Sequence, residues 1–342
     1  MVKEDKKMNV GIVGCGLIGN KRADSIASLK GHSLKIVANT SLNEAKRLAE
    51  KYNCRYTQDW RELVSDKEID IVIVATTNDW LTPVSIEAIR NSKHVIVEKP
   101  VARNPSELKK LVDVARKSHV KVKVGFNHRF HPAIQKAREL IKEGIIGELM
   151  FVRARYGHGA RKGYEKEWRS IPEIAGGGEV LDQGIHIIDL SRVFLGEFNQ
   201  VMGIVDTMFW DRKPEDNGFM ILRTPTGKIA QLSASCTQWK NLFSFEIFGK
   251  TGQINIDGLG RSYGIETLTL YKMKPEMGIP DKSVYEFPGE DDSWRLELEN
   301  LINSIENGTP LDGDLEDSVE AMKIVFSLYD WSKNFIENCG SS

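Results

Sequence analysis

The chain has 342 residues, of which 41% are hydrophobic and 28% are charged, and its formal net charge is −1. This length exceeds one typical core, so two domains are expected. A nearly neutral chain has no overall field that attracts nucleic acid or an anionic membrane. We find no apolar run near the roughly 20 residues that span a bilayer. The charged first seven residues lack the apolar core of a secretory signal, so the expected compartment is the cytoplasm.

The four cysteines are widely scattered and form no Cys-x-x-Cys pair: Cys15, Cys54, Cys236 and Cys339. This usage argues against a disulfide framework and against a zinc site, so we expect four reduced thiols. His128 and His131 are three residues apart, but no acidic residue lies close to them in sequence. We therefore expect no bound metal.

The first 126 residues alternate between strand and helix patterns. Short apolar segments predict strands at residues 8–13, 34–38, 69–75, 94–97 and 120–126. Amphipathic segments between them predict helices at residues 17–29, 43–52, 83–91 and 106–118. Alternation at this spacing indicates βαβ units in a doubly wound parallel sheet of the Rossmann type. The first predicted domain is residues 1–126.

The pattern changes in the second predicted domain, residues 127–342. After a helix at 132–143, longer alternating strands are expected at 148–158, 200–210, 219–224, 229–237, 243–248, 253–257 and 267–272. Helices are expected at 180–195, 294–307 and 315–334, with Trp294 and Trp331 in the core. Residues 275–292 are rich in Pro, Gly and acid and are interpreted as a surface loop. The pattern indicates an α+β domain with a large, mainly antiparallel open sheet.

A glycine-rich motif stands in the first βαβ unit. The run Gly14-Cys15-Gly16-Leu17-Ile18-Gly19 matches G-x-G-x-x-G, follows a predicted strand and opens a predicted helix. In that context the motif indicates a dinucleotide site. Gly14 permits the tight turn, Gly16 removes a Cβ that would block the pyrophosphate, and Gly19 lets the helix pack closely. The free N–H groups of the helix start would face the phosphates.

The residues that read the adenosine ribose are expected about 20 residues later. The sequence there is Asn39-Thr40-Ser41, without the carboxylate that binds the ribose of NAD and repels the 2′-phosphate of NADP. Thr40 and Ser41 could donate to a phosphate that Lys46 or Arg47 reaches, and Asn39 could equally serve NAD. Lys46 and Arg47 are also explained as a solvated helix face. The choice between NAD and NADP stays open.

Two further segments carry residues suited to catalysis. Glu98-Lys99-Pro100 follows a predicted strand, at the carboxyl edge where doubly wound sheets bind ligands, and Pro100 is a candidate for a cis peptide bond. Gly176-Gly177-Gly178 leads into a predicted helix on which Asp182, His186 and Asp189 would share one face. An imidazole beside a carboxylate suits proton transfer. A surface turn, a capping Asp and a packed core His explain the same segments without catalysis.

Together with Phe126-Asn127-His128-Arg129-Phe130, these motifs resemble the Gfo/Idh/MocA family of oxidoreductases in order and spacing, from about residue 8 to residue 335. The resemblance implies hydride transfer between NAD or NADP and a secondary alcohol of a sugar, inositol or sugar nucleotide. It also implies a homodimer or homotetramer formed through the large sheet. Lys99, Asp182 and His186 match the family's catalytic residues. The run Asn78-Asp79-Trp80-Leu81 departs from the pattern, because it keeps the Asn and replaces the His of many relatives.

In the catalytic hypothesis, His186 takes the hydroxyl proton, Asp182 holds His186 or a neighbouring hydroxyl, and Lys99 stabilises the developing alkoxide. The expected cofactor-binding residues are Gly14, Gly16, Leu17, Ile18, Gly19, Asn39, Thr40, Ser41, Thr76, Asn78, Glu98, Lys99 and Asn127. The expected substrate-binding residues are Lys99, Asn127, Arg129, His158, Trp168, Asp182 and His186, with Tyr164 and Arg169 also near the pocket.

Three alternatives stay open. The loop at residues 157–174 is interpreted as a sugar-binding lid, whose cations Arg161, Lys162, Lys166 and Arg169 either bind a phosphate or form a solvated charged surface. The nicotinamide could remain bound and act transiently, in glycoside cleavage or in hydride exchange between two sugars. A regulator that binds dinucleotide without catalysis would have no need of Lys99, Asp182 and His186 together.

Overall fold

The computed structural model describes residues 7–339. Residues 1–6, on which most of the signal-peptide prediction rests, lie outside the described residues. The chain forms two compact units: unit 1 contains the residues up to Asn127 together with Asp292–Ser318, and unit 2 contains His128–Asp291 and the chain from Val319 onward. The expected boundary after residue 126 lies one residue from this division. The segment Asp292–Ser318 was expected in the second domain but belongs to unit 1.

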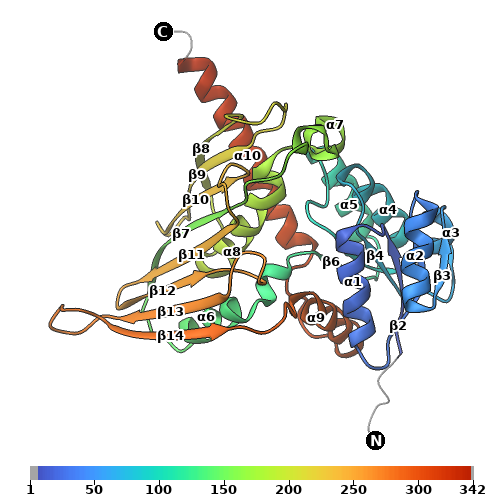
Figure 1. Ribbon diagram of the computed structural model, residues 1–342. Helices are drawn as coiled ribbons and strands as arrows, with labels where there is room; N and C mark the ends of the chain where they lie inside the picture. The colour runs from blue at the N-terminus through green and yellow to red at the C-terminus, as the bar shows by residue number, and fades with distance from the viewer. Residues whose placement is uncertain (1–6, 340–342) are drawn as a thin grey trace, which may run out of the picture. The chain divides into compact units, whose positions relative to one another are not determined.

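Unit 1 is built on a six-stranded parallel sheet of order β3-β2-β1-β4-β5-β6 (Figure 1). This is the Rossmann strand order, which reverses direction between β1 and β4. The strands are β1 (Asn9–Val13), β2 (Ser33–Ala38), β3 (Arg55–Thr57), β4 (Ile71–Val74), β5 (His94–Val97) and β6 (Val122–Val124). The helices are α1 (Leu17–Ser28), α2 (Leu42–Tyr52), α3 (Trp60–Ser65), α4 (Asn78–Arg90), α5 (Pro105–Ala115) and α9 (Ser293–Asn307). The predicted parallel sheet is confirmed.

Unit 1 differs from the sequence prediction in three elements. Strand β3 and helix α3 were not predicted. Strand β3 is three residues long and exposes Arg55 and Tyr56, so the sequence has no apolar run there. Helix α4 begins at Asn78, whereas the prediction took Pro83 as its start. Thr77, whose hydroxyl donates to the Asp79 carboxylate at 2.6 Å, precedes the first turn instead.

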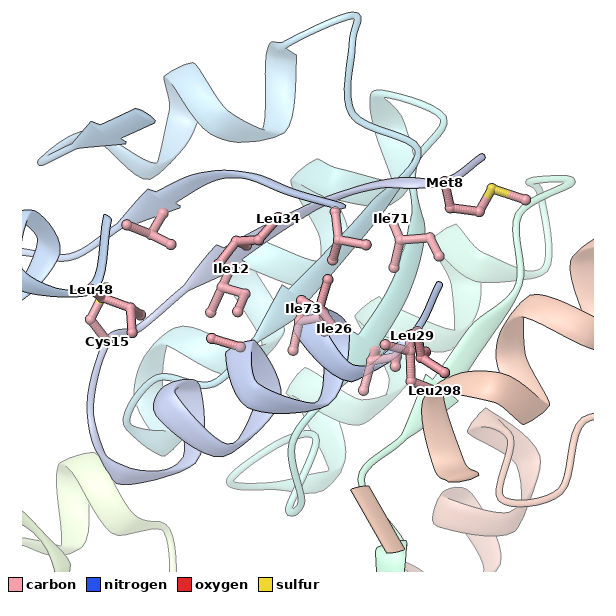
Figure 2. Close-up of a cluster of buried hydrophobic side chains, with 14 of the residues drawn as sticks. Met8, Ile12, Cys15, Ile26, Leu29, Leu34, Leu48, Ile71, Ile73 and Leu298 are labelled. Carbon is pink, nitrogen blue, oxygen red and sulfur yellow. The ribbon is translucent and has the colours of Figure 1, made fainter. Parts of the chain in front are cut away.

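The apolar core of unit 1 explains why the distant helix α9 belongs to it. Ile12 and Ile71 from the sheet pack with Ile26 from α1 and Leu298 from α9, all with exposed fractions of 0% (Figure 2). Leu301 and Ile302 of α9 join the same cluster. Since complete burial of such a side chain contributes about 1.5–3 kcal/mol, α9 closes a face of unit 1 that would otherwise be wet.

Unit 2 contains an eight-stranded sheet of order β14-β13-β12-β11-β7-β10-β9-β8, in which all neighbours are antiparallel except β7 and β10 (Figure 1). The strands are β7 (Leu149–Gly157), β8 (Gln200–Asp206), β9 (Asn217–Arg223), β10 (Ile229–Ser235), β11 (Leu242–Gly249), β12 (Gly252–Asp257), β13 (Glu266–Lys272) and β14 (Asp281–Phe287). The longer helices are α6 (Pro132–Lys142), α8 (Ile185–Leu195) and α10 (Leu315–Cys339), and α6 and α8 pack against the sheet. Shorter helical turns are η1 (Asn127–Phe130), η2 (Tyr164–Lys166), η3 (Trp168–Ser170), α7 (Pro172–Ala175) and η4 (Val180–Gly184). The predicted large, mainly antiparallel sheet is confirmed.

Three expectations for this part of the chain were wrong. Strand β14 lies inside the segment that was interpreted as a loop. Most of its side chains are exposed, so the strand is defined by its backbone pairing with β13 and not by an apolar sequence pattern. The single helix expected at 180–195 is a π-helical turn, η4, followed by α8. Trp331 is 42% exposed, whereas Trp294 is buried as expected.

Arg22 is the most demanding group in unit 1, because its exposed fraction is 0%. Its guanidinium pairs with Glu98 and Glu297, each at 2.5 Å. We predict that Arg22→Leu lowers the free energy of unfolding by about 3–5 kcal/mol, because it leaves two buried carboxylates without a counter-charge. Urea titration followed by circular dichroism measures the change.

The matched control for this variant is Arg116→Leu. Arg116 pairs with Glu316 at 2.9 Å, but its side chain is 64% exposed. An exposed pair contributes at most about 1 kcal/mol. Equal destabilisation by the two variants would contradict the special role of Arg22.

Candidate active site

The glycine loop has the geometry that its motif requires. Gly14, directly after β1, has φ +101°, and a Cβ built there would lie 2.2 Å from the Ala75 carbonyl oxygen. A Cβ on Gly19 would lie 1.9 Å from the Gly14 oxygen, so only glycine lets α1 approach so closely. At Gly16 a Cβ would meet no atom within 4 Å, so this position opens onto free space. The roles predicted for the tight turn and the close helix approach are confirmed, and the open side at Gly16 fits an incoming phosphate.

The start of α1 adds electrostatics that suit an anion. Gly16 precedes the helix without a side-chain cap, and the first turn has no acidic residue. The N–H groups of Leu17 and Ile18 therefore stand at the positive end of the helix dipole. Leu17 is 77% exposed, so nothing bulky covers this end. The residues present fit a dinucleotide pyrophosphate.

The ends of β2 and β4 carry the other residues expected to contact the cofactor. Asn39, Thr40 and Ser41 follow β2, and the Cys15 N–H donates to the Asn39 Oδ1 at 3.4 Å. Thr76 follows β4, and Asn78 is the first residue of α4, with a buried side chain. These positions lie at the carboxyl ends of parallel strands, where such sheets bind their ligands.

The turn after β5 holds Lys99 at the same edge of the sheet. The Lys99–Pro100 peptide bond is cis, as the sequence suggested, and Lys99 is half-buried. Glu98 turns inward and pairs with Arg22, so its carboxylate is engaged within unit 1. Asn127, at the end of unit 1, donates through Nδ2 to the Ser293 hydroxyl at 2.9 Å.

In unit 2 a buried carboxylate fixes the triple-glycine turn. Glu215 accepts from the N–H of Gly178 at 2.8 Å, from the N–H of Val180 at 3.1 Å and from the Tyr329 hydroxyl at 2.8 Å. A Cβ on Gly178 would lie 1.9 Å from the Glu215 carbonyl oxygen. Glycine is therefore required for the backbone to reach Glu215, and the turn launches η4 in a fixed direction.

Asp182 lies in η4, and π-helical turns are often found at functional sites. Its Oδ2 accepts from the Arg169 Nε at 2.9 Å, and Arg169 stacks on Trp168 with 4.4 Å between guanidinium and ring centre. Asp182 lies in this π turn, whereas His186 and Asp189 lie in α8, so the three residues do not belong to one continuous α-helix as the sequence suggested. Asp189 instead forms a buried pair with Arg129.

His186, in α8, is packed among aromatic rings. Its imidazole stacks on His128 with ring centres 3.8 Å apart and an interplanar angle of 15°. Tyr156 meets both rings edge-on, at 5.2 Å from His128 and 6.2 Å from His186. The stack holds the plane of the His186 ring. The sequence did not predict it, because the two histidines are 58 positions apart.

A second acid, Glu179, was also missed. Its Oε1 accepts from the Tyr164 hydroxyl at 3.0 Å, and its Oε2 lies 3.6 Å from the Nε2 of His158, a predicted substrate residue. Burial, with Asp182 adding to it, raises the pKa of Glu179 to about 7. Burial has the opposite effect on the pKa of His158, which it lowers, because burial disfavours the charged form of each group. The only available signal was an acid directly after three glycines, and sequence does not reveal desolvation.

Within residues 7–339, no group of three or more His, Cys, Asp or Glu side chains is arranged to hold a metal, and no helix is long and apolar enough to cross a membrane. Cys15, Cys54 and Cys236 are free thiols. The side chain of Cys339 lies outside the described residues.

The fold and the glycine loop define a dinucleotide-binding α/β protein, and the comparisons place it in a family. Residues 8–126 match the model of the oxidoreductase family with an NAD-binding Rossmann fold, and residues 134–255 match the Gfo/Idh/MocA C-terminal domain. The chain belongs to the Gfo/Idh/MocA family.

Curated relatives span several activities. The chain is 31% identical to 2,7-anhydro-N-acetylneuraminate hydratase of Escherichia coli, over 73% of this chain and 68% of the relative. It is 30% identical to levoglucosan dehydrogenase of Pseudarthrobacter phenanthrenivorans, over 65% of this chain but only 60% of that enzyme. It is 24% identical to myo-inositol 2-dehydrogenase of Thermotoga maritima, over 89% of this chain and 90% of the relative.

A solved structure shows the same fold. Levoglucosan dehydrogenase in complex with NADH superposes with a TM-score of 0.89, covering 96% of this chain and 98% of that chain, at 23% identity.

Glu179 leads to a prediction about pH. Its pKa is raised from 4.5 in an ordinary environment to about 7, so the folded protein holds this proton more tightly than the unfolded chain. The resulting stability is complete below about pH 4.5 and is lost as pH rises through 7. Glu179→Gln mimics the neutral acid. Its melting temperature relative to the natural chain should therefore rise from about pH 5 to about pH 7 and level off between pH 7 and pH 8, with about 1.4 kcal/mol for each unit of pKa difference.

Differential scanning fluorimetry across that range measures the trend. Glu286→Gln is the matched control, because Glu286 is exposed on β14 and should give a difference that does not change with pH. A flat profile for Glu179→Gln would show that Glu179 is ionised throughout the range.

Proposed function

We propose that this protein is a nicotinamide-dependent dehydrogenase or reductase that acts on a secondary alcohol of a sugar or polyol. The observation that carries the proposal is the glycine loop, which is open at Gly16 and stands at an uncapped helix start. The resemblance of its motifs to the family also supports Lys99, Asp182 and His186 as the catalytic residues. Relatives named levoglucosan dehydrogenase, myo-inositol 2-dehydrogenase and D-glucoside 3-dehydrogenase support a sugar-like substrate.

The residues divide the chemistry among them. Bound nicotinamide supplies or accepts the hydride. His186 accepts the hydroxyl proton at a ring nitrogen, and its stack on His128 keeps the ring plane fixed while it does so. Lys99, as an ammonium, stabilises negative charge on the reacting oxygen. Asp182, balanced by Arg169, accepts a hydrogen bond from a substrate hydroxyl.

The charges of the predicted lid favour an uncharged substrate over a sugar phosphate. Arg161 pairs with Glu167 at 2.8 Å, and Arg169 pairs with Asp182 at 2.9 Å. Two of the four cations considered for phosphate binding therefore already have carboxylate partners. Lys162 and Lys166 are exposed. A phosphate would have to displace a carboxylate from an arginine, whereas a neutral sugar needs only hydrogen bonds.

Substitution of Lys99 tests the catalytic assignment. Lys99→Met should lower kcat/KM by about 10²- to 10⁴-fold, because the developing alkoxide loses its positive partner. The assay follows absorbance of reduced nicotinamide with NAD and NADP against inositols, free aldoses, sugar phosphates and nucleotide sugars. Lys110→Met, at an exposed position on α5, is the control and should keep full activity. Unchanged turnover in Lys99→Met would refute the assignment.

A second function rests on one observation: the relative at 31% identity is named a hydratase, which adds water without net oxidation. In this candidate the glycine loop would hold a nicotinamide that stays bound, and the cofactor would supply transient hydride chemistry without net turnover. A flat absorbance trace with every substrate, together with dinucleotide released on denaturation and a product detected by mass spectrometry, would favour it over the dehydrogenase.

We also propose that the free face of the large sheet joins two copies of the chain. Side chains that alternate outward on β8 and β9 are apolar and exposed: Met202, Ile204, Phe219 and Ile221. Ile204 pairs across the ladder with Phe219, and Met202 with Ile221, so the four form one continuous patch. Contiguous exposed apolar patches mark interaction sites.

The double variant Phe219→Glu and Ile221→Glu should dissociate the assembly, because burying two carboxylates in an apolar interface is strongly unfavourable. Light scattering after size-exclusion chromatography gives the mass directly. Ile279→Glu, at a residue 86% exposed in the segment before β14, is the control and should leave the mass unchanged. A natural chain that elutes as a monomer would overturn this proposal.

A further inference from the structure

The end of β2 lies directly against the glycine loop. The Gly14 N–H donates to the Ala38 carbonyl at 2.8 Å, and the Cys15 N–H donates to the Asn39 Oδ1 at 3.4 Å. Asn39 is thus bonded to the loop that fits the pyrophosphate. In a Rossmann sheet the residue at this point faces the adenosine ribose, and an acid there selects NAD. This chain has an amide instead.

A carboxylate nevertheless reaches the position from the next helix. Glu44, in the first turn of α2, accepts a hydrogen bond through Oε2 from the Asn39 Nδ2 at 2.7 Å. Ser41 caps the helix and accepts from the Glu44 N–H at 3.4 Å. Ser41 and Glu44 have capping-box spacing, in which the glutamate usually bonds to the cap backbone. Here its carboxylate extends to the end of the strand. We infer that Glu44 reads the adenosine ribose in place of the missing strand-end acid, and that it makes the protein select NAD over NADP.

The inference rests on the proposed use of a nicotinamide cofactor. Glu44 is exposed, and a carboxylate has about four lone-pair positions, so it can accept ribose hydroxyls while it keeps Asn39. The Ser41 hydroxyl accepts from the Glu44 N–H as the helix cap, which holds Ser41 and Glu44 together at this end of α2. The Thr40 carbonyl accepts from the Gln58 Nε2 at 2.9 Å, which ties down the turn.

The local charges also oppose a 2′-phosphate. The N-terminus of α2 would attract an anion, but the chain already supplies one there in Glu44. The Lys46 Nζ lies 3.9 Å from the Glu50 Oε1, so a carboxylate already stands beside this cation. Arg47 is the remaining cation in the first two turns of α2. Both Arg47 and Glu44 influence the pKa of the Cys15 thiol in the glycine loop, so the two effects can be compared there. The pKa of Cys15 is raised to about 12, first by burial and then by the charge of Glu44, whereas Arg47 lowers it by a smaller amount.

Direct binding tests this inference without requiring turnover. NADH and NADPH are titrated into the full chain, and fluorescence of the reduced nicotinamide gives each Kd. We expect NADH to bind at least about tenfold more tightly. Glu44→Gln keeps an acceptor for Asn39 but removes the charge, so it should tighten NADPH about tenfold and change NADH by less than about threefold. The matched control is Glu50→Gln, which removes the same charge from an exposed residue of the same helix and should leave the ratio unchanged.

Competition with adenosine 5′-monophosphate and with its 2′-phosphorylated form places the effect at the ribose. We expect the natural chain to bind the form without the 2′-phosphate more tightly, and this measurement does not depend on whether a variant folds. Equal binding of the two cofactors, tighter NADPH, or the same shift in Glu44→Gln and Glu50→Gln would overturn the inference alone. Loss of NADPH binding in Arg47→Ala would then identify Arg47 as the reading group. If neither cofactor binds the natural chain, the proposed function itself fails and this inference fails with it.

Discussion

A single buried guanidinium constrains much of unit 1. Arg22 has no exposed surface, so its charge must be balanced inside the protein, and Glu98 and Glu297 provide that balance. The ring of Trp294 covers it at 4.6 Å. These contacts fix α1, the end of β5 and α9 together. They also turn Glu98 inward, which leaves the next residue, Lys99, at the carboxyl edge of the sheet. Glu98 thereby acts as a positioning residue, whatever else it contacts.

In unit 2 a buried acidic side chain, instead of a buried basic one, is held by several partners. Glu215 is a buried carboxylate whose partners are backbone N–H groups of the triple-glycine turn and the Tyr329 hydroxyl. Because a buried charge without partners is costly, the turn cannot relax without exposing or orphaning Glu215. Asp182 follows this turn directly. In both units, a candidate catalytic residue lies close to a segment that a buried ionisable side chain holds rigid, and a rigid support is what a positioned proton or charge transfer needs.

The sequence predicted the features that repeat or that have one steric solution. Strand and helix alternation gave the parallel sheet, and the glycine spacing gave the loop, because each depends on local rules. Strand β14 was not predicted because it has no apolar face, and its backbone pairing with β13 is what makes it a strand. The burial of Arg22 was not predicted, because its two partners, Glu98 and Glu297, lie 76 and 275 positions away along the chain. The stack of His128 on His186 and the contact of Glu44 with Asn39 were missed because both depend on side-chain direction.

The environments of Glu179 and Asp182 separate two acids that lie three residues apart. Asp182 has a guanidinium partner in Arg169, whereas Glu179 is buried beside Tyr164, and burial and the charge of Asp182 both raise the pKa of Glu179. Such a division normally assigns different roles to two carboxyl groups in one site. Glu179, with a pKa of about 7, changes charge near neutral pH, and His158 lies beside it. The charge of this corner of unit 2 therefore changes with pH as Glu179 ionises, even while Asp182 stays paired with Arg169.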